Sequence, residues 1–268
     1  MRQWCAFWRS PACAGDRSAP PATFAASSLP GFHSSPIAVA PDAGLLLTVN
    51  PDSNSVSLID TVSLRLLAEI PVGPNPQTVS VDSSGGRAYV TNRDDDTLSI
   101  VDLNLGREVE ALLVGDEPFG VLASLDGRVY VSNSGSDAID VFDKTSLNRL
   151  ARIATGPSPR GLALSSDQKR LYVTHFLSGK LTLINTQNFS VETVISTGQD
   201  SNLSQAVVID SATQRAFLPQ TRSNSTNRAL LFETARSERL PLLTLDVRLA
   251  RAAQRLGLRL MEFENESL

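Results

Sequence analysis

A residue pattern recurs about every 42 residues through the middle of this chain. Segments related to Tyr-Val-Thr-Asn end at successive spacings of 42, 41 and 42 residues, at Asn50, Asn92, Asn133 and His175. Glycines recur at the same spacings, at Gly73, Gly115, Gly156 and Gly198. Prolines follow three of these glycines, at Pro76, Pro118 and Pro159. Because several kinds of residue share one period, each period corresponds to one structural unit.

Each unit has the composition of four short β-strands. In residues 74–115, the segments 78–81 and 97–101 alternate polar and apolar side chains. Segment 88–91 is β-branched and aromatic, and segment 109–114 is mostly apolar. Turn-forming sequences such as Ser-Ser-Gly-Gly separate the segments. Four strands in a period of about 40–50 residues are typical of a β-propeller blade, so an all-β propeller fold is predicted.

The repeats resemble a known family. Residues 89–92 read Tyr-Val-Thr-Asn, the tetrapeptide that names the YVTN-type β-propeller repeats. The resemblance is good over residues 35–198 and weaker over 199–232, and it implies a bacterial or archaeal protein located in the periplasm or outside the cell. Residues 157–227 also resemble propellers that precede a cytochrome-c-peroxidase-like domain in longer chains.

The period predicts how the chain is divided. Four blades of about 42 residues and one partial blade are expected, at 35–73, 74–115, 116–156, 157–198 and 199–232. Residues 1–32 are expected to be a disordered leader or a degraded secretion signal, because Arg9 and Asp16 interrupt the apolar run that a signal needs. Residues 233–268 form an atypical tail, in which the apolar spacing from Val247 to Glu262 predicts a short amphipathic helix.

Four to five blades are too few for the seven-bladed rings of the family, so an incomplete ring is expected. Three explanations stay open: the chain is a fragment or the product of a shifted reading frame, it closes through a second copy, or it forms a small ring. The change from strand-like to Arg/Leu-rich sequence near Glu233 favours the first. Open blade edges would also allow self-association.

Composition argues against several classes of function. The net charge of −4 disfavours a nucleic-acid-binding protein. No apolar run approaches the roughly 20 residues of a transmembrane helix. The two cysteines, Cys5 and Cys13, form no haem-binding CxxCH motif, and the two histidines, His33 and His175, supply a zinc site poorly. No cofactor and no metal are therefore expected.

The order of strands in a blade predicts where a binding face would lie. If the first strand runs from the top face to the bottom, the turn after Tyr-Val-Thr-Asn and the Gly-x-x-Pro link both return to the top face. Phe176 lies in one of these turns. The candidate binding residues in the turns and links are Gln77, Asn92, Asp94, Asp96, Phe119, Asn133, Arg160 and His175.

Each type of candidate has two interpretations. Asn92, Asp94 and Asp96 begin like a calcium loop, but Thr97 replaces the required glycine and Leu103 stands where a glutamate is needed, so turn formation is favoured. A histidine at position 175 either titrates near neutral pH or hydrogen-bonds its turn. An arginine at position 160 either holds an anionic group beside the central channel or lies on the rim.

These features favour a non-enzymatic binding or interaction scaffold. Its ligand, a protein or a small molecule, is expected at the top face. The alternative is the propeller portion of an enzyme system, either a lactonase-like hydrolase or the partner of a cytochrome-c-peroxidase-like domain absent from these residues. A hydrolase would need a cluster of metal ligands or catalytic groups that two histidines supply poorly. A truncated product without activity of its own is the third reading.

Overall fold

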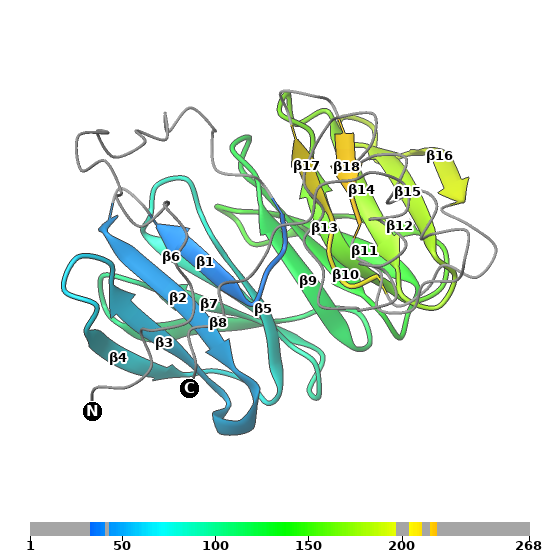
Figure 1. Cartoon of the computed structure of the whole chain (residues 1–268). Helices are drawn as coiled ribbons and strands as arrows, with labels where there is room; N and C mark the ends of the chain where they lie inside the picture. The colour runs from blue at the N-terminus through cyan, green and yellow to red at the C-terminus, as the bar shows by residue number, and fades with distance from the viewer. Residues whose placement is uncertain (1–32, 41–42, 197–203, 211–214, 219–268) are drawn as a thin grey trace, which may run out of the picture. The chain divides into compact units, whose positions relative to one another are not determined.

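The computed structural model describes residues 33–40, 43–196, 204–210 and 215–218 (Figure 1). In this part of the chain the regular structure is β-strand, apart from a 3-10 turn at Pro51–Ser53. The predicted leader, the predicted tail with its helix, and most of the partial fifth blade lie outside the described residues. No helix of the described part is long and apolar enough to span a membrane.

Four antiparallel sheets of four strands follow one another along the chain, and in each the strands lie in sequence order. The first sheet contains β1 (Ile37–Ala40), β2 (Leu45–Asn50), β3 (Ser55–Asp60) and β4 (Leu66–Pro71). The second contains β5 (Pro76–Val81), β6 (Arg87–Asn92), β7 (Thr97–Asp102) and β8 (Arg107–Leu113). The third contains β9 (Pro118–Ala123), β10 (Arg128–Asn133), β11 (Ala138–Asp143) and β12 (Arg149–Ala154).

The fourth sheet contains β13 (Pro159–Leu164), β14 (Arg170–His175), β15 (Lys180–Asn185) and β16 (Val191–Ser196). A further pair, β17 (Val208–Asp210) and β18 (Arg215–Phe217), forms a two-stranded sheet. Consecutive first strands contact one another, from β1 to β5, β9, β13 and β17. These successive four-stranded sheets confirm the predicted all-β propeller architecture (Figure 1).

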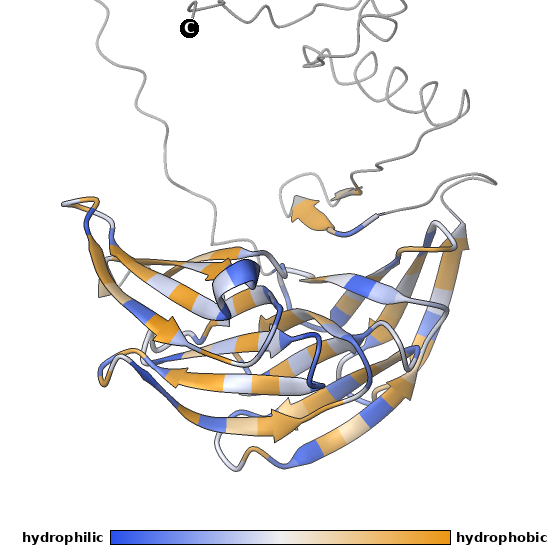
Figure 2. Ribbon diagram, turned by 90° about the horizontal axis from the view of Figure 1, so that it is seen from below, coloured by the Kyte–Doolittle hydropathy of each residue, from blue (hydrophilic) through white to orange (hydrophobic). Residues whose placement is uncertain are grey.

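The hydrophobic core lies between neighbouring blades. Hydrophobic and hydrophilic residues alternate along the strands (Figure 2), so each sheet has an apolar face to bury. Tyr89 of the second blade is fully buried and packs in one cluster with Val121 and Val131 of the third. Tyr130 of the third blade packs in the same way with Leu162 of the fourth. The tyrosine of the repeat therefore joins one blade to the next.

The hydroxyl residue of the repeat ties the backbones of adjacent blades together. Ser132 Oγ donates a hydrogen bond to the Arg160 carbonyl oxygen (2.6 Å) and accepts one from the Gly120 N–H (2.8 Å). Thr91 Oγ1 donates to the Phe119 carbonyl oxygen at 2.6 Å in the preceding pair of blades. The pairing of β9 with β10 shifts register between Val131 and Asn133, and the Ser132 hydroxyl lies in this irregular step.

The last residue of the repeat is buried beneath the repeated glycine. Asn92 Nδ2 donates to Ser99 Oγ at 2.7 Å within its own blade. A Cβ atom added to Gly73 would come within 2.5 Å of the Asn92 side chain, so only glycine allows this close approach. Gly115 and Asn133 form the corresponding pair in the next unit. Glycine and asparagine therefore share the period because they contact each other across adjacent blades.

Candidate functional site

The top-face turns are fixed by acidic and amide side chains. Asp96 has a φ of 58° and its Oδ1 accepts the N–H of Glu117 at 3.0 Å. Asp137, with a φ of 51°, accepts the N–H of Ser158 at 2.8 Å in the next unit. Asp94 accepts a separate hydrogen bond, from the Asn75 side-chain amide at 2.9 Å. These carboxylates connect the turns to the links between blades.

Three of the predicted site residues lie inside the blades. Asn92, Asn133 and His175 have exposed fractions of 0%. Asn133 Nδ2 donates to the buried Asp140 carboxylate at 3.0 Å. His175 Nε2 lies 2.7 Å from Thr182 Oγ1, and its Nδ1 lies 3.1 Å from the Pro157 carbonyl oxygen. The amide nitrogens of the two asparagines and the ring nitrogens of His175 contact the strands and links around them, whereas Asn92 Oδ1 and Asn133 Oδ1 have no hydrogen-bond partner among the described residues.

Burial makes His175 a source of acid sensitivity. Burial lowers the pKa of its imidazole, and the Pro157 and Gly156 backbone groups oppose this shift. The unfolded chain keeps a normal histidine pKa and binds the proton first, so this contribution to stability is present above about pH 6.5 and is lost as the pH falls towards the folded pKa. Because a single proton is involved, the free energy of unfolding changes by at most about 1.4 kcal/mol per pH unit.

We expect His175→Asn to reduce this pH dependence. Asparagine occupies the equivalent position in the other blades, so the variant should still bond to Thr182 while losing the titrating ring. Urea unfolding between about pH 7.5 and pH 5.5 measures the slope of stability against pH. A slope in His175→Asn equal to that of the unaltered protein would contradict the assignment.

The residues after the repeated prolines begin the inner strands at the top face. Gln77, Phe119 and Arg160 each occupy the second position of β5, β9 and β13. Gln77 Nε2 is bonded to the Asn75 side chain at 2.6 Å. Arg160 instead meets two aromatic rings: its guanidinium carbon lies 4.6 Å from the Phe119 ring centroid and 3.6 Å from that of Phe176. Of the predicted residues, the structure thus brings Phe119, Arg160 and Phe176 together.

An ion pair lies beside these three residues. Arg93 Nη2 is 2.8 Å from Glu117 Oε2, and both side chains are partly exposed. Burial lowers the pKa of the Arg160 guanidinium, the positive charge of Arg93 lowers it further, and Glu117 opposes the shift. An arginine remains protonated in proteins, so Arg160 carries its charge in a partly desolvated position. We call Phe119, Arg160, Phe176 and the Arg93–Glu117 pair the Arg160 cluster.

Arg160 differs in its hydrogen bonding from the other two described arginines that stack on phenylalanine. Arg128 lies over Phe189 at 5.1 Å and also donates to the Thr186 carbonyl oxygen at 2.5 Å. Arg149 lies over Phe142 at 5.5 Å and also donates to the Leu113 carbonyl oxygen at 3.1 Å. The Arg160 Nε atom is buried, and among the described residues its guanidinium has no hydrogen-bond or ion-pair partner.

Sequence reasoning did not single out Arg93 and Glu117 as a pair. Arg93 directly follows Tyr-Val-Thr-Asn in the second unit, and Glu117 directly precedes Pro118 in the link to the third. Both positions belong to segments that the strand order assigns to the top face. That shared location was the available signal, but it does not specify which turn meets which link.

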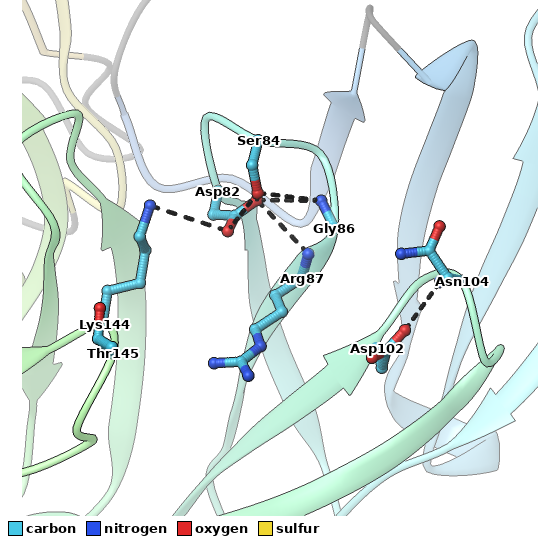
Figure 3. A pocket seen from close by; sticks show the side chains of 8 residues that line it. All are labelled: Asp82, Ser84, Gly86, Arg87, Asp102, Asn104, Lys144 and Thr145. Atoms are coloured by element: carbon cyan, nitrogen blue, oxygen red, sulfur yellow. Dashed lines mark hydrogen bonds and ion pairs between the residues drawn. The ribbon is translucent and has the colours of Figure 1, made fainter.

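A second candidate is a pocket of about 390 Å³ at the opposite ends of the strands (Figure 3). It is lined by residues of three turns: Asp82, Ser84, Gly86, Arg87, Asp102, Asn104, Lys144 and Thr145. The Asp82 carboxylate accepts the Gly86 N–H at 3.1 Å, and Asp102 accepts the Asn104 N–H at 2.9 Å. These carboxylates stabilise their own turns, and this pocket contains no buried side-chain donor without a partner.

The sequence matches no protein-family model and no curated protein. Among solved structures, the chain is similar to hydrazine synthase of Kuenenia stuttgartiensis, with a TM-score of 0.62 and 28% identity over 71% of this chain and 56% of that chain. It is also similar to the dihydro-heme d1 dehydrogenase NirN in complex with DHE, with a TM-score of 0.56 and 16% identity over 72% and 50% of the two chains. The chain thus spans about half the length of each of these structures. The similarity identifies the chain as a β-propeller protein.

Proposed function

We propose that this chain is a non-enzymatic binding module of the YVTN type, and that its ligand binds at the Arg160 cluster. One observation carries the proposal: Arg160 has a buried Nε donor without a partner, beside two aromatic rings at the top face. An unpaired buried donor costs stability unless something binds it. Phe119 and Arg160 of the cluster belong to β9 and β13, which contact each other.

A fragment screen by ligand-observed NMR tests the location of binding. The library contains neutral, anionic and cationic compounds, and the full chain is compared with two variants. We expect compounds that bind the unaltered protein to lose binding in Phe176→Ala, because this ring is the nearer of the two rings that stack on the Arg160 guanidinium, at 3.6 Å. They should keep binding in Lys144→Ala, which alters the pocket at the other end of the strands.

The opposite pattern would contradict the proposed location. Loss of binding in Lys144→Ala with binding retained in Phe176→Ala would place the site in the pocket of Figure 3. Absence of any binding compound would contradict a small-molecule binding function. Thermal unfolding of both variants provides the control that each remains folded.

The second candidate is the propeller portion of a redox enzyme system. It is favoured by the 28% identity to hydrazine synthase over 71% of this chain, which covers 56% of that chain. The resemblance of residues 157–227 to propellers that precede a cytochrome-c-peroxidase-like domain also supports it, and since these residues hold no CxxCH motif the haem would belong to a partner. Co-purification of a haem absorption band with the full chain from its source would support this candidate, and a colourless preparation would contradict it.

The resemblance to YVTN-type repeats further supports a bacterial protein in the periplasm or outside the cell. Fractionation of the source cells tests this location, and recovery of the chain in the cytoplasmic fraction alone would contradict it. Self-association through blade edges is tested by light scattering coupled to size-exclusion chromatography. A concentration-independent monomer would exclude self-association in solution.

A further inference from the structure

We propose that the group recognised at the Arg160 cluster is a carboxylate, and that Arg160 binds it through its N–H edge. The inference rests on the proposed function, since it specifies the chemistry of the ligand at the same site. It starts from the unused hydrogen-bonding capacity of Arg160. A guanidinium has five N–H donors in one plane, and the Arg160 side chain has no polar partner among the described residues.

The aromatic contacts do not use these donors. Phe176 and Phe119 interact with the guanidinium through their ring faces, at 3.6 Å and 4.6 Å from its central carbon. Such cation–π contacts are electrostatic and do not satisfy the in-plane N–H groups. The two terminal nitrogens of a guanidinium can donate two parallel hydrogen bonds to a planar, two-oxygen acceptor. The rings already contact Arg160, so they fix its orientation and lower the entropy lost on binding.

The charges around Arg160 favour a ligand with one negative charge. Arg93 and Glu117 neutralise each other at 2.8 Å, which leaves the single charge of Arg160 uncompensated. One carboxylate would balance this charge. A phosphate dianion would bring an extra negative charge close to Glu117, whose field already reaches Arg160. The partial burial of Arg160 strengthens the attraction, because fewer water molecules screen the pair.

One of the other two stacked arginines provides a reference within the same molecule. Arg128 also lies over a phenylalanine ring, but it already contacts the Asp126 carboxylate at 3.1 Å. That contact shows the type of partner that Arg160 lacks. We therefore expect an added carboxylate to bind to Arg160 and not to Arg128.

Arginine Nε–H resonances in NMR spectra test the proposal directly. The full chain is labelled with ¹⁵N-arginine, and the Arg160 resonance is assigned by its disappearance in Arg160→Lys. Benzoate, benzamide, phosphate and chloride are titrated at constant ionic strength. We expect benzoate to shift the Arg160 resonance saturably and to bind about tenfold or more tightly than benzamide, which lacks the charge. The Arg128 resonance should not move.

Three outcomes would overturn the proposal. Equal affinities for benzoate and benzamide would show that the cluster binds without recognising a carboxylate, which leaves the proposed binding function intact. Tighter binding of phosphate, or an equal effect of chloride, would assign the site to another anion or to non-specific screening. No response of the cluster to these probes or to any compound of the fragment screen would contradict both proposals. The titration of the unaltered protein decides these outcomes even if Arg160→Lys does not fold.

Discussion

Gly120→Ala is expected to lower the free energy of unfolding by about 3 kcal/mol or more. A Cβ atom at this position would overlap the backbone oxygen of Arg160 in the next blade, and it would come within 2.8 Å of Ser132 Oγ. Backbone atoms of a packed inner strand cannot move away without separating the blades. The hydroxyl of Ser34, 3.2 Å from the added carbon, restricts movement further.

Gly86→Ala is the matched control for this substitution. The nearest atom to its added Cβ would be Ser84 Oγ at 3.5 Å, an ordinary contact distance, and its φ lies outside the left-handed region. We expect the free energy of unfolding to change by less than about 1 kcal/mol. Equilibrium urea unfolding of the full chain measures both variants. Similar stabilities for the two would contradict the close approach of β9 to β13.

Ser132→Ala is expected to lower the free energy of unfolding by about 2–4 kcal/mol, because it removes one hydroxyl that is hydrogen-bonded to two buried backbone groups. The Gly120 N–H would lose its 2.8 Å acceptor, and the Arg160 carbonyl oxygen would lose its 2.6 Å donor. The Ser132 side chain is fully buried, so water cannot easily replace it. The change also loosens the strand that positions Arg160.

Ser196→Ala removes the same hydroxyl group from an exposed strand position on β16. This substitution should change the free energy of unfolding by no more than about 0.5 kcal/mol. The two variants are compared by urea unfolding under the same conditions. If Ser132→Ala were as mild as Ser196→Ala, the hydroxyl bridge between the third and fourth blades would not stabilise the fold.

The repeat pattern predicted the architecture because its constraints are local and recurrent. Alternating side chains in segments such as 97–101 specify a strand, and β7 spans Thr97–Asp102. The shared period of Gly73 and Asn92 pointed to a common unit. Their contact explains that period, but the sequence could not show it, since the two residues belong to adjacent blades.

The site was predicted less completely than the fold. Strand order predicts that the site residues lie at the top face, but it gives no information on depth, so buried Asn92 and half-buried Arg160 are equivalent in the sequence pattern. The stacking of Arg160 on Phe176 depends on how one link meets one turn within a blade. The Arg93–Glu117 pair depends on the corresponding contact between blades. Such contacts follow from packing, which the repeat pattern does not encode.

The most direct test of the binding site uses ¹⁹F NMR of the full chain labelled with fluorophenylalanine. Binding of a compound from the fragment screen should shift the Phe119 and Phe176 resonances together. The Phe189 resonance should remain unchanged, because Phe189 stacks on Arg128, which already has a polar partner. A shift of Phe189 with Phe119 and Phe176 unaffected would contradict the assignment of ligand binding to the Arg160 cluster.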